Sequence, residues 1–188
     1  MEAVLRIIAV DGLERASLRE VADEAGLAVG SVRHYFAGSE ELLTYSFATV
    51  LDRILRRLGG VLPAVAAAVP GSREQRAAVM AVLGGLLPLD EIRAVEACAW
   101  MAFKNAARTR PFLAGEADRS HREVAAIAGQ VVAALMPADE PQDALVVEAE
   151  RLLATLDGLC MHALLQPGWM TAEMCSDVLE RHLDGLGG

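Results

Sequence analysis

Side chains that can donate hydrogen bonds to nucleic acid gather between residues 17 and 39. Arginine binds O6 and N7 of guanine in the major groove, and a small apolar side chain such as Val29 can contact a thymine methyl group. Hydroxyl groups suit phosphates, which set the register of a protein on DNA rather than its sequence preference. The candidates for base edges are Arg19, Arg33 and His34, and those for phosphates are Ser17, Ser31, Tyr35 and Ser39.

Two short helices joined by a tight turn would position these groups, and residues 17–36 predict such a unit. Ser17 followed three residues later by Glu20 is a capping box, so we expect a helix to start directly after Ser17. Gly26 can adopt the positive φ needed where that helix stops. The next helix would bury Val32 and present the candidate side chains outward. This is the geometry of a DNA-binding helix-turn-helix. An ordinary helical hairpin with a solvated surface is the alternative.

The stretch SLREVADEAGLAVGSVRHYF, with GLERAS before it and FAGSEELL after it, resembles the DNA-binding domain of TetR-family transcriptional regulators. The matching positions are Ser17, Val21, Ala22, Ala25, Gly26, Leu27, Ala28, Gly30, Ser31, Val32, Tyr35, Phe36, Glu40, Leu42 and Leu43. The resemblance implies an N-terminal three-helix helix-turn-helix domain and a C-terminal helical bundle that binds a ligand and dimerises. We expect the first domain, with its linking fourth helix, over 1–58 and the second over 59–188.

Some features depart from the family pattern. Relatives commonly have a phosphate-binding lysine where this chain has Ser39, and often a tyrosine where it has Arg33, so the role of Arg33 is the least transferable. Many have a basic arm before the first helix, whereas this chain begins almost at the helix, so we expect that contact to be absent or the start to be trimmed. The net charge of −9 also argues against general binding of polyanions. Affinity should therefore depend on a few well-placed contacts and on dimerisation.

Composition predicts an all-α protein. Only 4% of the residues are aromatic, alanine and leucine are abundant, and no strand-like alternation is sustained. No apolar run has the length of a bilayer span and the start lacks a leader, so we expect a cytoplasmic protein without a membrane partner. The three cysteines, Cys98, Cys160 and Cys175, are predicted to be reduced core thiols.

Apolar spacing and helix-breaking residues predict the remaining elements. The densest cluster of breakers runs from Gly59 to Ser72, and we place the domain boundary there. The expected helices cover residues 1–11, 39–58, 73–87, 89–110, 112–136, 141–165 and 171–183.

The last two expected helices carry broad apolar stripes. On pattern alone such a stripe is core. The resemblance implies instead that these two helices form half of an intermolecular four-helix bundle in a homodimer. The predicted interface residues are Leu152, Leu156, Leu159, Ala163, Val178 and Leu179.

Methionine and aromatic side chains of the second half could line a cavity for an apolar ligand. At helical spacing, each such side chain is more often a plain core residue than part of a pocket. The resemblance implies an inducer between the middle helices, but nothing identifies it. The predicted pocket residues are Met80, Trp100, Met101, Phe103, Phe112, Met161 and Trp169.

Catalytic chemistry is not indicated. The four histidines are scattered, and the sequence has no metal-ligand spacing, nucleophile elbow or phosphate-binding glycine loop. We therefore expect no enzyme, metal or cofactor. The expected function is a ligand-released repressor that binds a palindromic double-stranded operator as a homodimer. The alternative is an all-helical ligand-binding or protein-interaction module without sequence-specific DNA binding.

Overall fold

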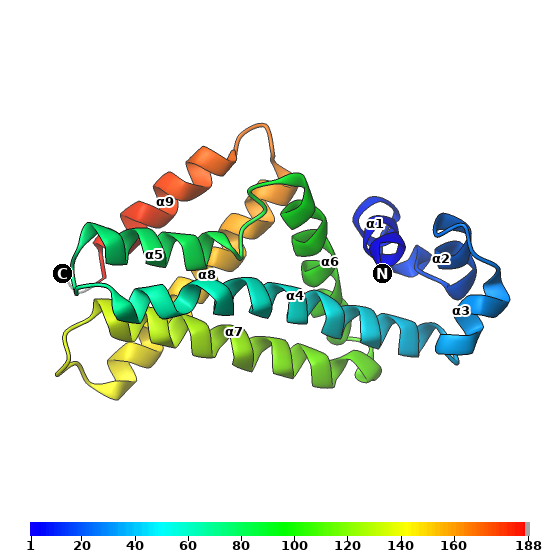
Figure 1. The fold of residues 1–188 in the computed structure, drawn as a ribbon, viewed down its shortest axis with the longest axis horizontal. Coiled ribbons are helices and arrows are strands. Elements are labelled where there is room, and N and C mark those ends of the chain that lie inside the picture. Colours follow the sequence, from blue (N-terminus) through cyan, green and yellow to red (C-terminus); the bar gives the residue numbers. More distant parts are fainter. Residues whose placement is uncertain (187–188) are drawn as a thin grey trace. The chain divides into compact units, whose positions relative to one another are not determined.

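The computed structural model describes residues 1–186, and over this part of the chain all regular structure is helical (Figure 1). The predicted all-α class is confirmed. The elements are α1 (Glu2–Asp11), the 3-10 turn η1 (Leu13–Arg15), α2 (Leu18–Glu24), α3 (Val29–Tyr35), α4 (Ser39–Ala67), α5 (Arg73–Gly84), α6 (Glu91–Ala107), the 3-10 turn η2 (Pro111–Leu113), α7 (Ala114–Leu135), α8 (Gln142–Leu165) and α9 (Ala172–Asp184).

Packing divides the chain into two compact units. The first contains residues 1–53 and 94–120, and the second contains residues 54–93 and the chain from residue 121 onward. Helices α4, α6 and α7 each contribute to both units. The division along the chain near residue 58 stays a prediction.

The first unit is built around a core shared by α1, α4 and α6. Leu5 of α1 is fully buried, and the ring of Phe47 on α4 stacks on that of Phe103 on α6 with centroids 5.0 Å apart. Polar contacts surround this core. Arg53 on α4 lies 2.5 Å from Glu2 and 3.7 Å from the buried Glu96, so one guanidinium serves two carboxylates.

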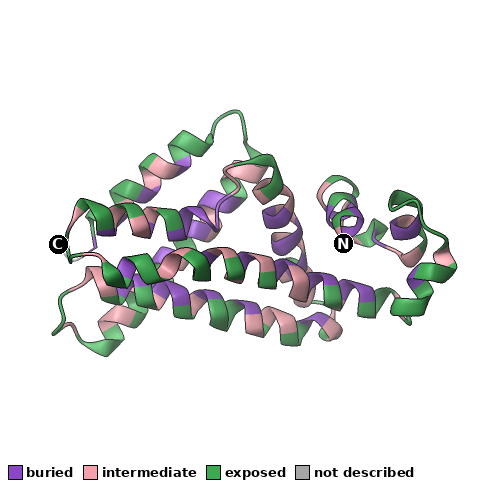
Figure 2. Ribbon diagram, viewed as in Figure 1, coloured by how far each residue is buried: buried purple, intermediate pink, exposed green. Residues whose placement is uncertain are grey.

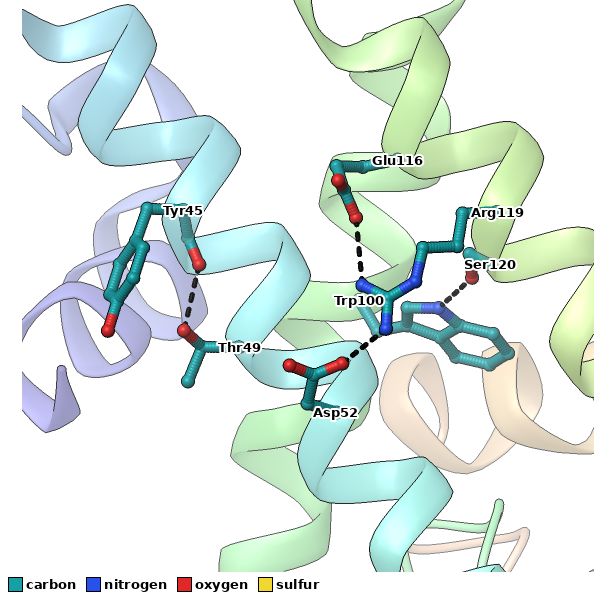
Figure 3. A network of polar contacts seen from close by, with 7 residues as sticks. All are labelled: Tyr45, Thr49, Asp52, Trp100, Glu116, Arg119 and Ser120. Atoms are coloured by element: carbon teal, nitrogen blue, oxygen red, sulfur yellow. Dashed lines mark hydrogen bonds and ion pairs between the residues drawn. The ribbon is translucent and has the colours of Figure 1, made fainter.

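A second set of polar contacts joins α4 and α6 to the first turns of α7 (Figure 3). Arg119 binds Asp52 on α4 at 2.5 Å and Glu116 on its own helix at 3.3 Å. The indole nitrogen of Trp100 donates to the hydroxyl of Ser120 at 2.8 Å. The Arg119–Asp52 contact thus ties α7 to α4, and the Trp100–Ser120 contact ties α6 to α7.

The second unit buries the facing sides of α5, α8 and α9. Ser72 caps α5 by accepting from the backbone N–H of Gln75 at 3.1 Å, and Thr171 caps α9 by accepting from that of Met174 at 3.2 Å. The buried side chain of Gln75 donates to the carbonyl of Ala134 at 3.1 Å, which ties α5 to the end of α7. Capping and burial therefore both favour the observed helices of this unit.

The end of α4 differs from the sequence-based expectation. We expected the helix to stop at Leu58, but it continues to Ala67 and includes Gly59, Gly60 and Pro63. Each glycine costs a helix interior about 1 kcal/mol relative to alanine. Burial of Val65 beyond the breakers, at 2% exposed, outweighs this local cost because helices in proteins gain most of their stability from packing. The other helix ends lie within a few residues of those predicted.

Candidate DNA-binding site

Local hydrogen bonds hold α2 and α3 at a fixed turn. The Ser17 hydroxyl accepts from the backbone N–H of Glu20 at 3.2 Å. The reciprocal half of the expected capping box is replaced, because the Glu20 carboxylate binds Arg15 instead. Gly26 has a φ of 67°, and the N–H of Leu27 reaches back to the carbonyl of Ala22 at 2.8 Å. This is a Schellman turn, which ends α2 sharply and sets the direction of α3.

Nearly all residues of helix α3 are exposed or partly exposed, as their colours in Figure 2 show. Of its seven residues, Val32 is the one that is buried. Ser31, Arg33, His34 and Tyr35 are exposed, and the Tyr35 side chain is 75% exposed. A short helix with one apolar anchor and an outward face of donors can enter a major groove.

All eight predicted DNA-binding residues belong to the first unit. Six of them are exposed, while Ser17 and Val29 are partly buried. The Arg19 side chain is 83% exposed and its Nε lies 3.9 Å from the Asp23 carboxylate. An exposed pair at this distance contributes little, so Arg19 can turn toward a base edge at small cost.

Helix α4 begins at Ser39, which is also the first residue of the expected helix 39–58. The carbonyl of Gly38 accepts from the N–H of Leu42 at 3.1 Å, and the Glu41 carboxylate accepts from the N–H of Ala37 at 2.7 Å. Ser39 is exposed on the first turn.

Sequence reasoning did not single out two other residues beside the end of α3. Glu41 and Tyr45 lie one turn apart on α4 and line a hollow of about 270 Å³ together with Tyr35 and Phe36. An acid in the first turn of a helix that reaches back to a preceding N–H is a recognisable signal for Glu41. Tyr45 carries no such signal.

The predicted ligand-pocket residues are divided between the two units. Met80, Met161 and Trp169 belong to the second unit, and the other four belong to the first. In the first unit Trp100 and Phe103 are core residues with ring or hydrogen-bond partners. Trp169 is 79% exposed.

An open groove of about 510 Å³ lies in the second unit, and none of the seven predicted pocket residues lines it. It is formed by α7 and α8. Its lining residues are Ala125, Ala126, Gly129, Gln130, Ala133, Gln142, Leu145, Val146, Ala149 and Glu150.

Four of the six predicted dimer-interface residues are buried within a single copy of the chain. Leu152, Leu156, Leu159 and Leu179 are at most 5% exposed within a single copy, because α8 and α9 turn these side chains toward the core of their own unit. Ala163 and Val178 are partly exposed. The apolar stripe was therefore identified correctly, but these four leucines present no surface to a second copy.

The described part of the chain gives no support for a metal site or for a reactive cysteine. Between residues 1 and 186 no group of three or more His, Cys, Asp or Glu side chains is placed to hold a metal ion. Burial raises the pKa of the Cys98 and Cys175 thiols, which disfavours the reactive thiolate. Over the same residues no helix combines the length and apolar character needed to cross a bilayer.

Comparison with known proteins accounts for both parts of the chain. Residues 1–45 match the family model described as bacterial regulatory proteins, tetR family, and residues 75–188 match that of the BetI-type transcriptional repressor C-terminal domain. The HTH-type transcriptional regulator PksA of Bacillus subtilis (strain 168) is 31% identical over 187 residues, which cover 98% of this chain and 86% of PksA.

Solved structures agree with this match. A transcriptional regulator from Rhodococcus sp. Rha1 is 31% identical with a TM-score of 0.82, covering 98% of this chain and 92% of that one. The multidrug binding protein EbrR, complexed with ethidium, is 25% identical with a TM-score of 0.65, covering 96% of this chain and 94% of that one.

Proposed function

Because the chain belongs to the TetR family of helix-turn-helix transcriptional regulators, which are DNA-binding proteins and not enzymes, we propose that it is a homodimeric repressor released from its operator by a small molecule. The observation that carries the proposal is the exposed donor face of α3, held at a Schellman turn beside α2. The match of residues 75–188 to a repressor-type C-terminal domain favours repression over activation. An operator-binding role also favours a cytoplasmic location.

The proposed base contacts come from Arg19, Arg33, His34 and Val29. Arg19 and Arg33 supply exposed guanidinium groups, which suit guanine, and the partly exposed Val29 suits a thymine methyl. The proposed phosphate contacts are Ser17, Ser31, Tyr35 and Ser39. Oxygen Oγ of Ser17 accepts a backbone N–H, which leaves its own O–H as a donor for a phosphate.

Dimerisation through α8 and α9 is supported by apolar side chains that a single copy leaves exposed. Val147, Met161 and Leu165 follow one face of α8 and are 64%, 44% and 68% exposed. Met174 on α9 is 40% exposed. Exposed apolar side chains gathered on one helix face favour an interface there. Small residues on the same face of α8, Ala154 and Gly158, permit close approach of a second helix.

A dimer places two copies of α3 about one DNA turn apart, roughly 34 to 36 Å, and so requires a pseudo-palindromic operator. A ligand that favours another spacing would release it. We propose an organic effector held in the second domain, since EbrR, a relative of similar length, binds ethidium. Of the predicted lining residues, Met80, Met161 and Trp169 belong to the second unit and are retained in this proposal.

The proposal is tested by selecting duplexes from a randomised pool with the purified protein. The expected result is a pseudo-palindrome bound by two chains, as measured by anisotropy and light scattering. Placed across a reporter promoter, this operator should lower expression, and ethidium-like organic cations added to the complex should be screened for release. Selection of no motif would favour a helical ligand-binding or protein-interaction module. Raised expression would make the protein an activator.

A further inference from the structure

The orientation of α3 depends on few contacts of its own. The helix has seven residues, its N-cap Ala28 forms no side-chain hydrogen bond, and Val32 is its one buried side chain. A helix held by a single apolar anchor can pivot about it. The links at its two ends therefore decide how its outward face meets DNA.

At the N-terminal end the Schellman turn supplies such a link, and at the C-terminal end two side chains of α4 do so. The Glu41 carboxylate accepts a hydrogen bond from the backbone N–H of Ala37 at 2.7 Å. One turn later, the ring of Tyr45 packs on that of Phe36, with centroids 5.4 Å apart and planes tilted by 54°. Two consecutive residues of the α3–α4 link are thus held by two side chains on one face of α4.

We infer that Glu41 and Tyr45 are positioning residues for DNA recognition, which fix the C-terminal end of α3 without reading bases. They hold Phe36 and Ala37 in place while the neighbouring Tyr35 stays 75% exposed, available to a phosphate. Residues held within about 0.5 Å of their productive geometry by such supporting contacts bind more tightly than loosely held ones.

The effect of the Glu41 hydrogen bond on DNA binding can be separated from the effect of its negative charge. A carboxylate beside a proposed phosphate-binding edge opposes DNA through its charge. Its hydrogen bond to Ala37 has the opposite effect, because it holds the reading helix in place. Glutamine keeps the acceptor oxygen and removes the charge, whereas alanine removes both. The two variants have the same net charge, so the difference between them isolates the hydrogen bond.

The test compares Glu41→Gln with Glu41→Ala on the duplex that the parent protein selects from a randomised pool. We expect Glu41→Ala to bind about three- to tenfold more weakly than Glu41→Gln, the effect of one hydrogen bond. Both should show the same slope of affinity against salt, steeper than that of the parent, because both lose the repelling charge. Glu41 is exposed, so both variants should unfold at the parental temperature.

A second pair tests the ring contact. Tyr45→Phe keeps the stack on Phe36 and should bind DNA like the parent, whereas Tyr45→Leu should lose affinity for selected and unselected duplexes by a similar factor. Equal affinities of Glu41→Gln and Glu41→Ala would overturn the role of Glu41. A weakened Tyr45→Phe would make Tyr45 a direct DNA contact instead.

The inference rests on the proposed function. Whether the parent protein selects a duplex shows which of the two fails. If the parent selects no duplex, the proposed function fails. If the parent binds its duplex and neither pair of variants differs, only the positioning role fails.

Discussion

The indole Nε1 of Trp100 donates a hydrogen bond to the Ser120 hydroxyl at 2.8 Å, and the two residues are 4% and 0% exposed (Figure 3). A buried donor that loses its acceptor keeps the cost of its desolvation. We therefore expect Ser120→Ala to lower the free energy of unfolding by about 1 to 3 kcal/mol, measured by urea denaturation.

Ser46→Ala is the matched control for this change. Ser46 is also 0% exposed, but its hydroxyl donates to the carbonyl of Leu42 inside α4, which keeps a helical partner when the hydroxyl is removed. It should cost less than about 1 kcal/mol. Equal losses for the two serine variants would show that the indole contact adds nothing.

Gly84, the last residue of α5, and Gly85, its C-cap, predict opposite effects of alanine. A Cβ on Gly85 would lie 2.6 Å from Cδ2 of Leu58 and 2.9 Å from the carbonyl oxygen of Val82, so Gly85→Ala should destabilise the protein by about 1 to 3 kcal/mol. A Cβ on Gly84 would meet Leu89 at 3.4 Å, an ordinary contact, and Gly84→Ala should gain up to about 1 kcal/mol of helix stability. Thermal unfolding of both variants tests this, and shifts of the same sign would contradict it.

The pairing of α8 and α9 should depend on pH through His182. Its Nδ1 lies 3.2 Å from the Thr155 hydroxyl, and its buried Nε2 has no hydrogen-bond partner among residues 1–186. Burial lowers the pKa of His182 below its ordinary value of 6.5, and Arg151 lowers it further, while Glu148 acts in the opposite direction. A neutral imidazole is therefore favoured in the folded chain.

The sign of the pH effect follows from proton binding. Below pH 6.5 the unfolded chain binds a proton at His182 more readily than the folded chain does. The contribution is therefore complete above pH 6.5 and is lost as the pH falls from there toward the folded pKa. His182→Asn should flatten this part of the stability profile. An unchanged profile in His182→Asn would refute the assignment.

The sequence predicted best the features that depend on neighbours along the chain. The Ser17 cap and the Gly26 turn involve residues three to five apart, so residue type and spacing were sufficient. The predicted end of α4 was wrong because burial of Val65 outweighs the helix-breaking tendency of two glycines and a proline. The spacing correctly predicted an apolar face on α8. Spacing alone does not tell whether Leu156 packs inside its own chain or against another copy. Glu41 and Tyr45 were missed because their importance depends on the position of the α3–α4 link.

The proposed dimer predicts which apolar residues tolerate charge. Met161→Glu combined with Leu165→Glu should yield a folded monomer, because both side chains are exposed in one copy and would be buried between two. Leu156→Glu should instead unfold the protein, since Leu156 is 3% exposed within the chain. Light scattering and thermal unfolding distinguish these outcomes.

Ile92→Glu is the control for the dimer variants. Ile92 is 74% exposed on α6, which is not one of the two helices of the proposed interface, and its charge should leave the dimer intact. A monomeric parent, or a double variant that stays dimeric, would place the interface elsewhere.

Base reading and phosphate binding should respond differently to substitution. The Arg19 side chain is 83% exposed and 3.9 Å from Asp23, so its guanidinium is available for a guanine. Arg19→Ala should cost about 1 to 3 kcal/mol in operator binding and relax the preference at one base pair per half-site. Selection from a randomised duplex pool measures the preference, and anisotropy measures the affinity.

Tyr35→Phe is the comparison that separates the two roles. The Tyr35 hydroxyl is assigned to a phosphate, which carries no sequence information, so its loss should weaken all duplexes alike by about 0.5 to 1.5 kcal/mol. Neither residue belongs to the core, and both variants should keep the parental unfolding temperature. A base-preference profile of Arg19→Ala with the same shape as that of the parent would remove Arg19 from recognition. Reading would then fall to Arg33, His34 and Val29 on α3, because these are the other proposed base contacts on the helix that follows the Schellman turn.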